Sequence, residues 1–165
     1  MLLETAPGPD IGLPAAAALA GLPPAGARTL IATLETADLV RRPSQGRCRM
    51  HDLVRLYAAE RAGRDLPAPA RKEALERLVR AYTAMACAAD RVLYPHRPAI
   101  TAAPGRGDVP ADATAALAWF EGELPCLLAA QAPAAGLGMD VAAWQLAWGM
   151  NTFRARGAGA RTARP

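Results

Sequence analysis

His51 and Asp52 are the adjacent residues of this 165-residue chain best placed to contact a ligand. They follow a β-like run over 47–50 and open a segment whose apolar residues at i, i+3 and i+4 predict a helix over 52–64: Leu53, Leu56 and Tyr57. An acid suits a first helical turn, because the exposed N–H groups and the helix dipole are positive there. His51 would then lie at a strand–helix corner, within reach of a ligand or a neighbouring domain.

Combinations typical of catalysis or metal binding are missing elsewhere. Ser44 is the only serine and lies in a predicted turn, while Glu121 and Glu123 are too close in sequence to share a helix face. The two histidines have no partners at metal-ligand spacing. The three cysteines are far apart and odd in number, which fits reduced thiols: Cys48, Cys87 and Cys126. We therefore predict no enzymatic activity and no metal site.

Four arginines flank a predicted turn over 43–46, where they could contact a nucleic-acid backbone: Arg41, Arg42, Arg47 and Arg49. The helix predicted just before them has one arginine against acidic residues, which is poor for binding phosphates. The net charge of +4 comes from four arginines after Phe153; the other 15 basic residues (19 − 4) equal the 15 acids. Composition therefore gives little support to a DNA-binding face.

The elements that position these residues are mostly helices. Helices are predicted over 14–20, 24–37, 52–64, 70–93, 113–132 and 140–153, and short strands over 39–41 and 47–50. Pro125 should kink or break its helix, because proline inside a helix costs roughly 3 kcal/mol relative to alanine. The chain has no apolar run of 18 residues and no signal-like N-terminus, so we expect a cytoplasmic protein without a membrane span.

These elements predict a mainly α fold, in which a partial winged helix (helices plus a small β-hairpin) precedes an α-helical, repeat-like region. The winged helix is partial because only residues 1–6 precede it, too few for the usual first helix. The predicted divisions are a partial winged-helix domain (1–64), a linking helix (65–98), a loop (99–111), a repeat-like helical hairpin (112–153) and a disordered basic tail (154–165).

The hairpin should be held by interlocking aromatic side chains: Trp119, Phe120, Trp144 and Trp148. A single hairpin of a repeat array lacks the neighbour that would bury its second face. We therefore expect an exposed apolar surface and possible self-association.

The stretch Arg47-Cys-Arg-Met-His-Asp-Leu-Val-Arg-Leu-Tyr-Ala58 resembles the region around the MHD motif of NB-ARC proteins, which are nucleotide-operated signalling switches of the STAND class. Three further stretches make the chain similar to actinobacterial AfsR/SARP-like transcriptional regulators: Pro7-Gly-Pro-Asp-Ile-Gly12, Asp90-Arg-Val-Leu-Tyr-Pro-His-Arg-Pro98, and Ala116-Leu-Ala-Trp-Phe-Glu-Gly-Glu123 leading to Ala143-Trp-Gln-Leu-Ala-Trp148. The resemblance covers nearly all of residues 5–153.

The resemblance implies that His51 contacts the phosphate of ADP, that Asp52 orients it and caps the helix, and that the winged helix closes as a lid on a nucleotide-binding domain. The chain has no G-x-x-x-x-G-K-[ST], so we expect no nucleotide cofactor of its own; ADP or ATP belongs to the parent family. The implied partner is the nucleotide-binding domain of a related regulator, or another protein.

The role implied is a fragment of a STAND-type regulator that serves as interdomain lid and protein-interaction region. A truncated or frame-shifted gene would explain both ends of the chain. Two alternatives remain: a free-standing winged-helix DNA-binding protein, and a helical protein–protein adaptor.

Overall fold

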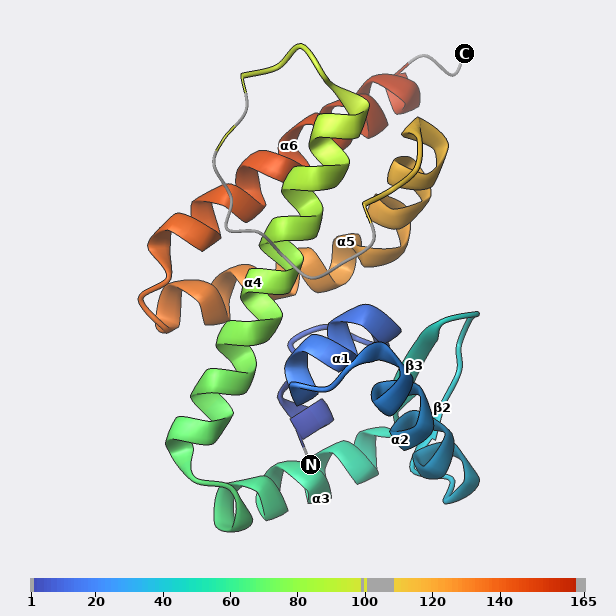
Figure 1. Cartoon of the computed structure of the whole chain (residues 1–165), viewed down its shortest axis with the longest axis vertical. Helices are drawn as coiled ribbons and strands as arrows, with labels where there is room; N and C mark the ends of the chain where they lie inside the picture. Colours follow the sequence, from blue (N-terminus) through green and yellow to red (C-terminus); the bar gives the residue numbers. More distant parts are fainter. Residues whose placement is uncertain (1, 99, 101–108, 163–165) are drawn as a thin grey trace. The chain divides into compact units, whose positions relative to one another are not determined.

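This computed structural model describes residues 2–98, 100 and 109–162 (Figure 1). The chain divides into two units, residues 1–79 and 80–165, and the division falls inside helix α4 (Ala68–Leu93). The predicted loop over 99–111 lies mostly outside the described residues. Among the described helices, none combines the length and the apolar character needed to cross a membrane.

Unit 1 has the element order of a winged helix. A 3-10 turn, η1 (Leu2–Thr5), precedes β1 (Ile11–Gly12), α1 (Leu13–Ala20), α2 (Pro24–Thr36), β2 (Val40–Arg41), β3 (Arg47–Met50) and α3 (Asp52–Asp65). In the described residues, η1 is the helical element that precedes β1. The prediction of a mainly α fold with a small hairpin is confirmed.

The hairpin gains a third strand that the sequence did not predict. β1 pairs antiparallel with β3, so the sheet order is β1-β3-β2. Two residues are too few to show the alternation that identifies a strand. Successive side chains on a strand point to opposite faces; Cys48 is buried while its neighbours Arg47 and Arg49 are partly exposed. The sheet therefore covers the core with one face and presents arginines on the other.

The first half of α4 belongs to unit 1 because Arg77 ties it to the end of α1. Gly21 ends α1 in the left-handed region (φ 68°), and its N–H donates to Ala18 O at 3.1 Å. Arg77 then donates to the carbonyls of Ala18 (3.2 Å) and Leu19 (2.9 Å). The unit consequently extends past the predicted boundary at residue 64.

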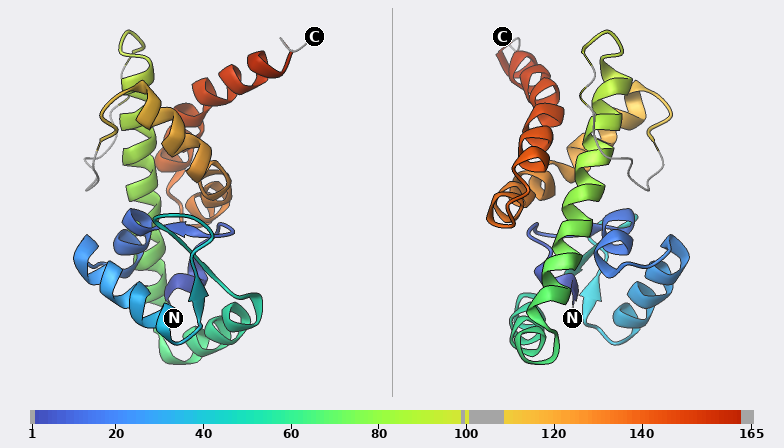
Figure 2. Two further views of the ribbon diagram at one scale, coloured as in Figure 1. Left: turned by 90° about the vertical axis from the view of Figure 1, so that its right-hand side faces the viewer. Right: turned by 60° about the vertical axis from the view of Figure 1, so that its left-hand side comes forward.

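Unit 2 contains the rest of α4, α5 (Ala113–Gly136) and α6 (Asp140–Thr162). Helices α5 and α6 form the predicted repeat-like hairpin, joined at Gly138, whose φ is 71° (Figures 1 and 2). Its largest fully buried side chains come from both helices: Phe120, Leu127, Leu146 and Met150. Where α4 meets α6, a side chain on Gly149 would approach the backbone of Ala86 to 3.2 Å, so glycine allows this close packing.

The aromatic packing is partly as predicted. Phe120 stacks on Phe153 with ring centres 5.2 Å apart, and Trp119 meets Phe120 edge-on at 5.1 Å. Trp144 corrects the prediction, because it is 53% exposed and its recorded ring contact is with Trp148. With the exposed Val141, it provides the open apolar surface expected of a single hairpin.

Two helices run further than predicted. The ribbon of α5 changes direction sharply between its gold and orange parts, as expected of a helix containing Pro125, but it continues to Gly136 (Figures 1 and 2). The backbone of α6 is helical to Thr162, whereas the sequence predicted a disordered tail from residue 154. Arginine and alanine favour helices, and no proline interrupts this segment before Pro165, which explains the correction. Residues 163–165 lie outside the described part.

Candidate functional site

His51 occupies the cap position of α3, with an extended backbone (φ −63°, ψ 143°). Its side chain is exposed and makes no capping hydrogen bond, while its carbonyl accepts the N–H of Arg55 at 2.8 Å. This corrects the expectation that Asp52 caps the helix. Asp52 is instead the acid of the first turn, where the dipole favours it.

The side chain of Asp52 is directed to solvent and to Arg49. Asp52 is 87% exposed, and its recorded ion pair is a long one, 3.9 Å to Arg49 Nη2. Within the described residues, no hydrogen bond or ion pair fixes the imidazole of His51. The orienting role of Asp52 stays a prediction, and the imidazole is available to an external group.

The four arginines predicted as nucleic-acid contacts have different surroundings. Arg47 pairs with Asp10 through contacts of 2.5 and 3.1 Å, and both side chains are largely buried. Arg42 pairs with Glu35 of α2 at 2.6 Å on the surface. Arg47 therefore contributes to the folded structure, and Glu35 offsets the charge of Arg42.

Arg41 and Arg49 remain as the more available cations. They are direct cross-strand partners in the β2–β3 ladder and so lie on the same face of the sheet. His51 follows the end of β3 directly, two residues after Arg49. We call these three residues, Arg41, Arg49 and His51, the basic corner. Like charges placed directly opposite each other destabilise a sheet, so this pair of arginines is better suited to binding an anion than to stabilising the fold.

The apolar pattern that predicted α3 faces outward. Leu53, Leu56 and Tyr57 are 81%, 69% and 63% exposed, and we call them the α3 stripe. The opposite side of the helix is buried through the small residues Ala58 and Ala62. Full burial of one such large side chain is worth about 1.5–3 kcal/mol, so leaving three uncovered is a substantial cost to the isolated unit.

The helix in the recognition position, α2, is poorly equipped to read bases. Thr29, Thr33 and Thr36 each donate the hydroxyl to the carbonyl four residues earlier, at 3.2, 3.1 and 3.0 Å. Arg28 is its only arginine. The forked donors and amides that bind base edges are thus nearly absent from this surface.

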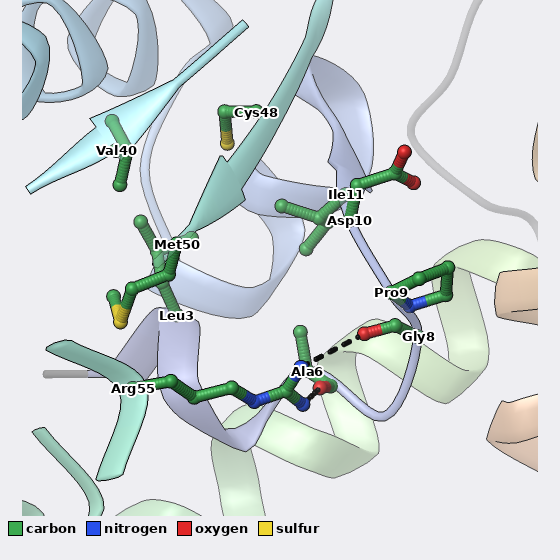
Figure 3. A pocket seen from close by; sticks show the side chains of 10 residues that line it. All are labelled: Leu3, Ala6, Gly8, Pro9, Asp10, Ile11, Val40, Cys48, Met50 and Arg55. Carbon is green, nitrogen blue, oxygen red and sulfur yellow. Dashed lines mark hydrogen bonds between the residues drawn. The ribbon is translucent and has the colours of Figure 1, made fainter. Parts of the chain in front are cut away.

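The interior beside the corner offers no reactive group. A pocket under the sheet, between η1 and the strands, is lined by Cys48, Met50 and Arg55 among others (Figure 3). Burial, aided by the negative charges of Asp10 and Glu35, raises the pKa of Cys48 to about 11, so the thiol is a poor nucleophile. Across the described residues, no cluster of three or more His, Cys, Asp or Glu could hold a metal ion.

Sequence reasoning missed two residues that support the corner, Asp10 and Arg55. Arg55 lies on the buried row of α3 with Ala58 and Ala62, at i, i+3 and i+7. A charged residue in a row of buried small residues needs internal partners, and this was the signal available in the sequence.

Two curated proteins, both named Regulatory protein AfsR, are similar to this chain. The one from Streptomyces griseus is 44% identical over 146 residues, which cover 84% of this chain and 15% of that protein. The one from Streptomyces coelicolor is 38% identical over 168 residues, which cover 95% of this chain and 16% of that protein. The chain thus spans about one-sixth of the length of these relatives. No protein-family model matches the chain, and no solved structure matches it.

Proposed function

We propose, from the relationship of this chain to one segment of the AfsR regulatory proteins, that it is the winged-helix segment of a STAND-type transcriptional regulator and works as an interdomain lid. Unit 1 closes on a nucleotide-binding domain in the ADP-bound state. Unit 2 is the start of a tetratricopeptide-like region, through which a signal releases the lid. In this role the chain is a non-catalytic, protein-binding component.

The α3 stripe carries this proposal. It begins two residues after His51, so the uncovered apolar surface and the uncovered imidazole share one end of the helix. An apolar surface next to polar groups is typical of a contact with another protein. The same unit presents a nearly neutral α2, which makes DNA a less suitable partner than a folded domain.

The basic corner supplies the nucleotide contact in this proposal. His51 donates to a phosphate oxygen of ADP held by the partner, as the MHD motif does by resemblance, with Arg41 and Arg49 adding positive charge. One charge-assisted hydrogen bond contributes on the order of 1.5–3 kcal/mol, which by itself corresponds to millimolar binding at best. The chain alone therefore has no measurable ADP affinity; micromolar affinity by calorimetry would contradict this.

Calorimetric titration of the chain into the separately expressed P-loop domain of an AfsR-type regulator tests the proposal. Binding is expected with ADP present, and Leu56→Asp should weaken it at least about tenfold, because a buried leucine contributes about 1.5–3 kcal/mol. Val141→Asp is the matched control, since Val141 is also exposed but lies in unit 2. Absence of binding, or equal loss with both variants, would refute the assignment.

The rival DNA-binding function makes a different prediction. Salt-sensitive binding of the chain to duplex DNA, removed by replacing Arg41 and Arg49 with glutamine and unaffected by Leu56→Asp, would favour a free-standing DNA-binding protein. A full-length relative captured through Trp144 of unit 2 would instead favour the helical adaptor.

A further inference from the structure

Arg55 reaches from α3 to the start of the chain. Its Nη1 donates to the carbonyl of Gly8 at 3.1 Å, and its Nη2 donates to the carbonyl of Ala6. Figure 3 shows the guanidinium turned towards both oxygens. A planar guanidinium suits this use, because its two nitrogens can hold two acceptors at once in a fixed geometry.

Arg47 reaches the same segment from the other side of His51. Its Nε and Nη2 both contact Asp10 Oδ1, at 3.1 and 2.5 Å, and the two side chains are only 14% and 22% exposed. The three acceptors just described, Ala6, Gly8 and Asp10, lie in residues 6–10, which connect η1 to β1. We call residues 6–10 the N-terminal strap.

His51 lies midway in sequence between the two arginines. Arg47 precedes it by four residues and Arg55 follows it by four. The strap also runs directly into β1, whose Ile11 pairs with Cys48 of β3. Since nothing in the described residues fixes the His51 imidazole directly, the main chain that carries it is held at two points by the same short segment.

We propose that Arg47 and Arg55 are positioning residues for His51 and act through the N-terminal strap. The strap sets the angle at which β3 passes into α3, and so sets where the imidazole meets its target. The identity of that target, a phosphate of ADP, rests on the proposed function; the positioning does not. Because coupling is reciprocal, a partner that fixes His51 also tightens the strap, and a displaced strap weakens the contact of His51.

Nuclear magnetic resonance of the intact chain tests this, because the chain has two histidines and His96, in the other unit, serves as an internal reference. Arg55→Ala should shift the ring resonances of His51 and leave those of His96 unchanged. It should also speed amide exchange at Gly8 and Asp10 by about tenfold or more, since hydrogen bonds from a charged group are lost. Arg61→Ala is the matched control: Arg61 is on the same helix and pairs with Asp65 at 2.8 Å.

The outcomes separate positioning from simple packing. Faster exchange in the strap with an unmoved His51 resonance would overturn the proposal, as would an equal shift from Arg61→Ala. Should Arg55→Ala unfold unit 1, Asp10→Asn provides the milder test, because it removes the charge and keeps the side-chain shape. Asp10→Asn must still shift the ring resonances of His51 and leave those of His96 unchanged. Unchanged ring resonances of His51 would refute the proposal.

The same variants distinguish this inference from the proposed function. If His51 responds to the strap but the chain does not bind a nucleotide-binding domain, the positioning holds and the partner is wrong. If the wild-type chain binds that domain and Arg55→Ala binds equally well, the positioning is wrong and the partner holds.

Discussion

Replacing Arg97 with alanine removes the cation that compensates a buried carboxylate in unit 2. Asp90 lies in α4 with its side chain 10% exposed, and Arg97 Nη1 contacts both of its oxygens, at 3.0 and 3.3 Å. Thr152 of α6 donates its hydroxyl to Asp90 at 2.9 Å. Arg97 also lies over the ring of Trp148, 3.8 Å from its centre. One arginine thus joins the end of α4 to α6.

The expected cost follows from what Arg97→Ala leaves behind. Removing one partner of a buried ion pair costs about 3–5 kcal/mol, because the other charge stays buried and uncompensated. The lost contact with Trp148 adds about 0.5–2 kcal/mol. The hydroxyl of Thr152 still donates to Asp90, so we expect a loss near the lower end of the sum of these two costs, about 3.5–4 kcal/mol, in the unfolding free energy of unit 2. Adding Asp90→Asn to Arg97→Ala should recover at least about 1 kcal/mol, since the buried charge is then gone.

Urea unfolding followed by tryptophan fluorescence measures this selectively, because all three tryptophans, at 119, 144 and 148, lie in unit 2. Arg91→Ala is the control, as Arg91 is exposed on the same helix and should change stability by no more than about 0.5 kcal/mol. A loss below about 1 kcal/mol for Arg97→Ala, or a further loss when Asp90→Asn is added, would refute the reasoning.

Four other outcomes follow from the structure. Burial raises the pKa of the Cys48 and Cys87 thiols to about 11. Each thiol should therefore react with a thiol reagent at pH 8 about a hundredfold more slowly than it does in the unfolded chain. Because the folded state favours the protonated thiols, urea midpoints should fall as the pH rises from about 9 to 11. Gly149→Ala should lower the stability of unit 2 by about 1–2 kcal/mol, measured by fluorescence, because overpacking against Ala86 outweighs a gain in helix propensity of about 1 kcal/mol. Sedimentation should show mass increasing with concentration, and Val141→Lys with Trp144→Lys should abolish it; a constant mass for the wild-type chain would contradict this.

The helices and the hairpin could be predicted from the sequence because they depend on nearby residues. Proline and glycine mark where α1 and α2 begin and where α1 ends, and apolar spacing marks the segments between. The strand–helix boundary at His51 follows from the same local signals and was predicted correctly. The end of α6 was missed because weak helix-forming residues such as Gly157 and Gly159 lower the local preference without preventing the helix.

Tertiary structure decided how the corner is held and which surfaces stay open. Arg47 finds Asp10 across 37 residues and Arg55 finds Gly8 across 47, and no local pattern specifies contacts so far apart in sequence. The buried side of α3 was likewise decided by packing. Helix α3 packs against η1 with Ala58 and Ala62 buried and with Arg55 bonded to the strap, so the larger apolar residues stay exposed. The sequence by itself determined that a helix begins directly after His51; the non-local contacts of unit 1 determined which face of that helix stays exposed.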